Sequence, residues 1–141
     1  MQKKIAVIND LSGYGRCSLT VAIPVLSAMG HQCCPIPTAI LQTIRNFRFT
    51  FSMTIRKNDH IYGQMERTWT SFDAIATGFL GSEAQIGIVM EIVQKLKAEK
   101  TFVVVDPVMG DHGHAYETYT PEMCEQMKEL VCMADVVLPN V

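Results

Sequence analysis

The sequence lacks a long apolar run and an excess of basic residues. No run approaches the roughly 20 apolar residues of a membrane-spanning helix, and residues 1–4 lead straight into a short apolar stretch without signal-peptide features. Twelve Lys and Arg stand against fourteen Asp and Glu, for a formal charge of −2. This balance argues against binding to nucleic acid or another polyanion. We therefore expect a cytoplasmic protein without a membrane partner.

Cysteine is present, but it lacks the C-x-x-C spacing of a metal site. The chain has five cysteines, which are Cys17, Cys33, Cys34, Cys124 and Cys132. An odd set of this kind favours reduced, mostly buried thiols. Cys33 and Cys34 are adjacent in a predicted strand, so their side chains should point to opposite faces.

Strand and helix signals alternate along the 141 residues, of which 48% are hydrophobic and 18% charged. Apolar runs predict strands over residues 4–9, 32–39, 73–77, 101–105 and 135–138. Helical spacing predicts helices over residues 17–29, from Ser82 with Gln85 as a capping box, and from Pro121 after an N-cap at Thr120. The run 101–105 is typical of a strand buried on both faces. Pro35 and Pro37 confine the second strand to an edge or make it irregular.

This alternation predicts an α/β fold with a doubly wound, mostly parallel sheet, and we expect residues 1–141 to form a single partial domain. The last strand has no helix after it, so the sheet should be incomplete at the C-terminus. Residues 42–71 are atypical, because they hold four of the five arginines and show neither strand nor helix periodicity.

Three polar or glycine-containing clusters follow predicted strands, at residues 10–15, 78–82 and 106–111. Ligands of open α/β sheets bind at these carboxyl ends. Neither G-x-G-x-x-G nor G-x-x-x-x-G-K-[ST] is present, so a dinucleotide fold and a P-loop are poorly supported. Asp106 and Asp111 flank a turn and could hold Mg²⁺ beside nucleotide phosphates. The alternative is that Asp106 caps the turn and Asp111 is solvated.

Four motifs occur in a specific order, namely I-A-V-I-N-D-L-S-G-Y-G-R-C-S-L-T, A-T-G-F-L-G-S, V-V-V-D-P-V-M-G-D and A-D-V-V-L-P-N. Together they resemble the N-terminal half of pyridoxal kinases, the vitamin B6 kinase branch of the ribokinase superfamily. The matching residues are about 1–41 and 72–140. The resemblance implies a ribokinase-like fold and ATP-dependent phosphorylation of the 5′-hydroxymethyl group of pyridoxal, pyridoxamine or pyridoxine.

The resemblance also implies roles for individual residues. Asp10 and Ser12 match first-strand residues that contact the pyridine substrate. Phe79 matches an aromatic residue that lies against the ring, although simple core packing would also explain it. The family is commonly dimeric, which implies a homodimer.

A second set matches the nucleotide site of the family. Asp106 and Asp111 match an acidic pair near the ATP phosphates and cations, which implies Mg²⁺ and leaves room for a monovalent cation. Tyr119 matches a tyrosine in the loop over the nucleotide. Asn140 matches the asparagine of a T-P-N turn, although Leu138 replaces its threonine.

Several family features are missing. The substrate loop N-x-T-G-[FY] should fall near residues 43–47, where the chain has T-I-R-N-F. The Gly-rich G-T-G-D element, with the aspartate that acts as general base, is absent. We therefore assign no catalytic residue and expect this chain alone to be inactive. A hydroxymethylpyrimidine-type vitamin kinase and a non-catalytic fragment are the alternatives.

Residues 42–71 have a further interpretation. With suitable codons, a shifted reading frame restores a near match to the substrate loop, so we hypothesise that single-base slips scrambled this segment. Resequencing the gene through codons 40–72 tests the hypothesis, and DNA without such a shifted reading would end it.

Overall fold

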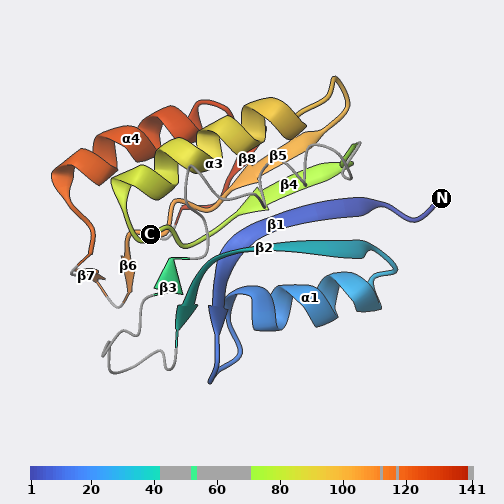
Figure 1. Cartoon of the computed structure of the whole chain (residues 1–141), viewed down its shortest axis with the longest axis horizontal. Helices are drawn as coiled ribbons and strands as arrows, with labels where there is room; N and C mark the ends of the chain where they lie inside the picture. The colour runs from blue at the N-terminus through green and yellow to red at the C-terminus, as the bar shows by residue number, and fades with distance from the viewer. Residues whose placement is uncertain (42–51, 54–70, 112, 117, 140–141) are drawn as a thin grey trace.

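The computed structural model describes residues 1–41, 52–53, 71–111, 113–116 and 118–139 (Figure 1). The atypical segment 42–71 therefore lies almost wholly outside the described residues, and so does the interpretation placed on it. The helices are α1 (Ser18–Ala28), α3 (Glu83–Leu96) and α4 (Pro121–Val131). The strands are β1 (Lys4–Ser12), β2 (Gln32–Leu41), β3 (Ser52–Met53), β4 (Ala74–Thr77), β5 (Phe102–Val105), β6 (Gly110–Asp111), β7 (His114–Ala115) and β8 (Val136–Val137).

The main sheet confirms the predicted fold class. Its strand order is β3-β2-β1-β4-β5-β8, and every neighbouring pair is parallel except β2 and β3. A separate two-stranded ribbon joins β6 to β7. Figure 1 shows α3 and α4 on one side of the sheet and α1 on the other, which is the doubly wound arrangement.

The main core lies between the sheet and the pair α3 and α4. Alternate residues of the central strands point into it, because successive side chains of a strand face opposite ways. The strands contribute Ala6, Ile8, Ile75, Val103 and Val105, and the helices contribute Ile86, Val89, Val93, Met123, Met127 and Leu130. All of these side chains are buried.

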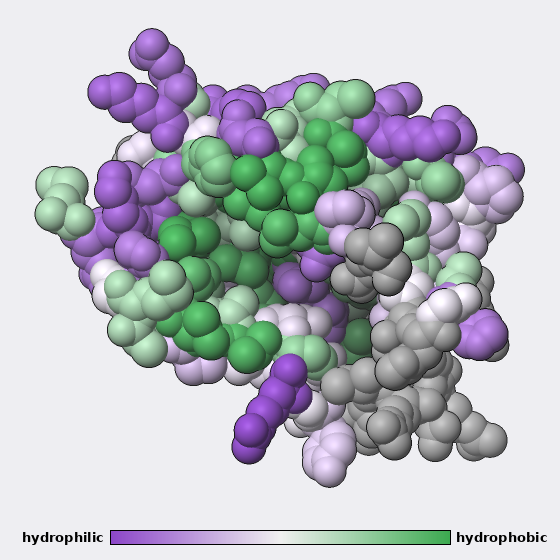
Figure 2. Space-filling view, turned by 180° about the vertical axis from the view of Figure 1, so that it is seen from behind, coloured by the Kyte–Doolittle hydropathy of each residue, from purple (hydrophilic) through white to green (hydrophobic). Residues whose placement is uncertain are grey.

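The opposite face of the sheet is covered only in part by the described residues. The expectation that β5 is buried on both faces is wrong, because Val103 and Val105 are buried while Phe102 is 48% exposed. Helix α1 packs on β1 and β2 and does not extend over β5 (Figure 1). Figure 2 shows hydrophobic side chains gathered over the middle of the molecule as seen from behind. The covering expected for a buried parallel strand is therefore present on one side of β5.

Strand β2 carries an irregularity where it pairs with β1. Between the paired residues Asn9↔Pro37 and Leu11↔Ile40, β1 has one residue and β2 has two, Thr38 and Ala39. This two-against-one pattern is a β-bulge. On the side away from β1, the described part of β2 pairs only with β3, at Ala39 and Ile40. The prediction of an edge or irregular strand is confirmed.

The bulge residue Thr38 connects the sheet to α3. Its hydroxyl donates to the carbonyl of Phe79 at 2.9 Å, and its carbonyl accepts from Gln85 Nε2 at 2.6 Å. Gln85 Oε1 accepts from the backbone N–H of Gly81 at 2.7 Å, and its own N–H donates to Ser82 Oγ at 3.3 Å. The predicted cap at Ser82 is present. The Gln85 side chain, however, accepts from the N–H of Gly81, the residue before Ser82, and not from the N–H of Ser82 itself.

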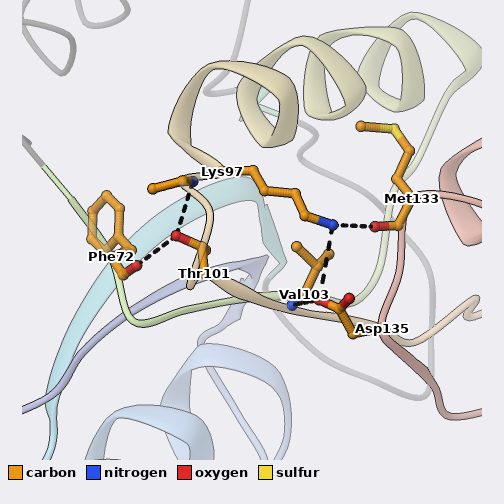
Figure 3. Close-up of polar contacts among 7 residues, drawn as sticks. Phe72, Lys97, Thr101, Val103, Met133 and Asp135 are labelled. Carbon is orange, nitrogen blue, oxygen red and sulfur yellow. Dashed lines mark hydrogen bonds and ion pairs between the residues drawn. The ribbon is translucent and has the colours of Figure 1, made fainter.

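A polar network closes the amino edge of the sheet (Figure 3). Thr101 Oγ1 donates to the carbonyl of Phe72 at 2.8 Å and accepts from the N–H of Ala98 at 3.0 Å. Asp135 Oδ2 accepts from the N–H of Val103 at 2.7 Å, and Lys97 Nζ lies 3.9 Å from the same oxygen. These contacts fix where β5 begins.

The cysteines are free, as expected, but the prediction that most are buried is wrong. Four are half-buried and Cys132 is exposed. Burial raises the pKa of the Cys33 and Cys34 thiols, which lie at successive positions of β2. In the described part of the chain, no helix has the length and apolar character to cross a membrane.

Candidate active site

A cavity of about 210 Å³ lies at the carboxyl ends of the central strands. Its walls come from the ends of β1 and β2, the start of α1, and the segments that follow β4 and β5. The lining residues are Asn9, Asp10, Ser12, Cys17, Ser18, Leu41, Phe79, Asp106, Val108 and Tyr116. The structure thus brings together Asp10, Ser12, Phe79 and Asp106, which the sequence places nearly 100 residues apart.

The end of β1 supplies two polar groups to this cavity. Asp10 and Ser12 are each only 2% exposed, and Ser12 Oγ donates to Asp10 Oδ2 at 2.8 Å. The prediction that this strand ends at Asn9 is wrong. Pairing with β2 resumes after the bulge, at Leu11↔Ile40 and Ser12↔Leu41, and it carries Asp10 into the strand. A buried carboxylate held by a neighbouring hydroxyl is well placed to accept a hydrogen bond from a ligand.

Asn9 links the clusters at residues 10–15 and 78–82 through hydrogen bonds, and the sequence did not predict it as a site residue. Its Oδ1 accepts from the N–H of Asp10 and from the N–H of Phe79, both at 2.9 Å. A Cβ atom on Gly78 would lie only 2.3–2.6 Å from the amide of Asn9, so a larger residue there would displace that amide from its hydrogen bonds. The signal available in the sequence was an amide side chain at the end of an apolar strand.

Phe79 contributes an aromatic wall. It is 8% exposed, and its ring meets that of Tyr116 edge-on, with 6.1 Å between centroids and 80° between planes. Phe79 lines the cavity and is itself buried, so both interpretations of this residue stay open. Tyr116, like Asn9, was missed, because the segment after Asp111 shows no periodicity.

The third cluster brings Asp106 to the cavity. Burial raises the pKa of its carboxyl group above the usual range, because a low-dielectric environment disfavours the charged form. Its backbone is fixed by a hydrogen bond from its N–H to the carbonyl of Thr77 at 3.2 Å. A cation bound next to Asp106 would favour the charged form of this carboxyl group.

The other predicted site residues do not line the cavity or are not among the residues that the structure describes. Asp111 belongs to β6, but its side chain lies outside the described part, and so does Asn140. Tyr119 packs against the main core rather than lining the cavity. Burial next to the Cys124 thiol raises the pKa of Tyr119 to about 12.

The side chains around the cavity determine which metal ion it could hold. Among the residues that the structure describes, no group of three or more His, Cys, Asp or Glu side chains is placed to hold a metal ion. Asp106 nevertheless places a carboxylate on the cavity wall. Mg²⁺ prefers oxygen ligands and usually takes one or two carboxylates plus substrate phosphates. The residues present therefore fit a cation that arrives with a phosphorylated ligand.

The sequence profile of phosphomethylpyrimidine kinases matches residues 21–141. The chain belongs to this family. A pyridoxal kinase from Lactobacillus plantarum is 30% identical, with a TM-score of 0.83 over 98% of this chain and 50% of that one. A Bacteroides thetaiotaomicron protein assigned to the phosphomethylpyrimidine kinases, crystallised with pyridoxal, is 41% identical, with a TM-score of 0.88 over 97% of this chain and 48% of that one.

A Schizosaccharomyces pombe protein assigned as a pyridoxal kinase is 26% identical over 98% of this chain and 46% of its own length. The chain thus spans about half the length of the relatives that it matches. These likenesses confirm the predicted resemblance to pyridoxal kinases and the ribokinase-like fold.

Proposed function

We propose that this chain forms the N-terminal part of a vitamin B6 kinase, which uses ATP to phosphorylate the 5′-hydroxymethyl group of pyridoxal, pyridoxamine or pyridoxine. The observation that carries the proposal is the cavity shared by Asp10, Ser12, Phe79 and Asp106. It combines an aromatic wall with buried polar groups, which suits a flat, polar ring. Two family relatives support the substrate class, because one is a pyridoxal kinase and the other was crystallised with pyridoxal.

Each residue has a role in this proposal. The buried pair Asp10 and Ser12 accepts hydrogen bonds from the polar substituents of the ring, and Phe79 packs against the ring itself. Asp106, with Asp111, holds Mg²⁺ at the ATP phosphates. The cation neutralises negative charge that develops during phosphoryl transfer.

Other parts of the proposal concern the nucleotide and the assembly. Tyr119 and Asn140 belong to the segments that cover ATP, a monovalent cation accompanies Mg²⁺, and the complete protein is a cytoplasmic homodimer. Residues 1–141 act as a single partial domain of that protein.

The proposal assigns no general base to residues 1–141, because the G-T-G-D element is absent from them. Removing the proton from the attacking hydroxyl therefore depends on groups outside this stretch. The chain alone should bind the vitamer and should not transfer phosphate.

A second candidate is phosphorylation of hydroxymethylpyrimidine, which the description of the matching family favours. Titration calorimetry with pyridoxine and with hydroxymethylpyrimidine distinguishes the two substrates. The test variant is Asp10→Asn, and Glu129→Gln on the exposed face of α4 is the matched control. We expect pyridoxine to bind more tightly, Asp10→Asn to weaken it, and the control to leave it unchanged.

An assay for pyridoxal 5′-phosphate with ATP and Mg²⁺ completes the test. Tighter binding of hydroxymethylpyrimidine would transfer the assignment to the second candidate. Binding of neither ligand would favour the non-catalytic fragment. Sustained formation of pyridoxal 5′-phosphate by the purified chain would overturn the expectation of inactivity.

A further inference from the structure

We infer that Tyr116 is a specificity-determining residue, which forms the second aromatic wall of the cavity and selects ligands with a flat aromatic ring. The inference rests on the proposed function and adds a residue to it. It starts from the edge-on contact of Tyr116 with Phe79, at 6.1 Å and 80°. Both rings line the cavity.

The backbone on either side of Tyr116 is anchored. Its N–H donates to the carbonyl of Met109 at 3.0 Å, and its carbonyl accepts from the N–H of Tyr119 at 2.9 Å. These two bonds tie Tyr116 to the segment after β5 and to the start of α4. The bonds fix the backbone of Tyr116, and its ring contacts that of Phe79 edge-on.

The two tyrosines of this segment have different surroundings. The Tyr119 hydroxyl is buried beside Cys124, and its ring packs on the core. Tyr116 instead lies with Val108 and Asp106 on the cavity wall. Of the two, Tyr116 is the one placed to touch a ligand in this cavity.

Two rings that meet nearly at right angles offer one face and one edge to a third ring. Aromatic rings favour both stacked and edge-to-face contacts because of their quadrupoles. A saturated ring of similar size gains only burial there. The wall made by Phe79 and Tyr116 should therefore favour a pyridine or pyrimidine ring over a cyclohexane ring.

The experiment compares two probes by titration calorimetry, pyridoxine and cyclohexylmethanol. The variants are Tyr116→Ala, Tyr116→Phe and the matched control Phe102→Ala, an exposed aromatic residue of β5 outside the cavity lining, each with its thermal unfolding recorded. We expect Tyr116→Ala to weaken pyridoxine binding by roughly three- to tenfold. The preference of the chain for pyridoxine over cyclohexylmethanol, measured as the ratio of the two dissociation constants, should become smaller. Tyr116→Phe, which keeps the ring, should restore that preference, and Phe102→Ala should leave it unchanged.

The outcomes separate this inference from the proposed function. If Tyr116→Ala binds both probes as the unchanged chain does while Phe79→Ala loses pyridoxine, the inference is overturned and the function stands. A third probe, 3-hydroxypyridine, has the ring of pyridoxine without its hydroxymethyl groups. If the chain binds it as tightly as pyridoxine, and Tyr116→Ala weakens both equally, the inference stands and the function fails. No binding of any aromatic ring by the unchanged chain would overturn both.

Discussion

The side-chain oxygen of Asn9 accepts the backbone N–H of Phe79 at 2.9 Å, which ties the end of β1 to the turn after β4. The same oxygen accepts the N–H of Asp10. One amide therefore fixes the backbone of two residues that line the cavity, one polar and one aromatic.

Replacing Asn9 tests this tie. Asn9→Ala leaves two partly buried N–H groups without their acceptor, which should lower the free energy of unfolding by about 1–3 kcal/mol. Asn9→Asp keeps an acceptor at the same place and should lose less in low salt at neutral pH. Urea unfolding measures both variants, and an equal loss in the two would show that the acceptor is not what matters.

Gly78→Ala tests the close approach of the β4 turn to Asn9. Its Cβ would lie 2.3–2.6 Å from the Asn9 amide, so the variant should be destabilised by about 1–3 kcal/mol. Gly87→Ala is the matched control, because a Cβ there meets nothing within 4 Å and the site is inside α3. That change should stabilise the chain by about 0.5–1 kcal/mol. In the double variant Asn9→Ala with Gly78→Ala, the total loss in the free energy of unfolding should be smaller than the sum of the two single losses. Chemical denaturation measures this difference.

Gln85→Leu tests the link between β2 and α3. The side chain is 1% exposed and bonds to Gly81 and Thr38, so its loss leaves a partly buried N–H and a buried carbonyl unpaired. We expect a loss of about 2–4 kcal/mol in the free energy of unfolding. Gln94→Leu, on the exposed face of the same helix, should change it by less than about 0.5 kcal/mol. Similar losses in both variants would contradict the role of the buried contacts.

Asp106 gives the chain a defined dependence on pH. Burial raises its pKa above the ordinary 3.8, so the folded state holds this proton more tightly than the unfolded state does. The contribution of Asp106 to stability is therefore most favourable below pH 3.8 and declines as pH rises through the folded-state pKa. Asp106→Asn should unfold at a higher urea concentration than the unchanged chain at pH 7, with the difference vanishing toward pH 3. An unchanged midpoint at pH 7 would show that burial has no such effect.

Phe102→Thr tests the face of the sheet that the described residues cover only in part. Phe102, Val136 and Leu138 are large apolar side chains that are 48%, 37% and 54% exposed. Exposed apolar groups and an unpaired strand edge promote self-association. We expect the change to reduce light scattering at a given concentration, whereas Lys100→Thr next to it should not. A sharp, cooperative unfolding of a soluble monomer by the unchanged chain would contradict this expectation.

The sequence predicted the parallel sheet well, because each of its main strands is a separate apolar run bounded by glycine or polar residues. It also located the clusters at residues 10–15, 78–82 and 106–111, since ligand sites gather at the carboxyl ends of strands. It placed the end of β1 too early, because the bulge that lets pairing resume depends on the partner strand. Asn9 and Tyr116 were missed for a related reason. Their importance comes from contacts with Phe79, which lies far from each in the sequence.

The bulge in β2 fixes the number of residues between Pro37 and Ile40. Thr38 is one of two β2 residues opposite a single residue of β1, and from there it bonds to both Phe79 and Gln85. Removing one residue between Pro37 and Ile40 would restore a regular ladder and cost those bonds. Substitutions at these positions preserve the spacing, whereas a deletion does not. Family members that keep this cavity should therefore align here without a gap, however much their residues differ.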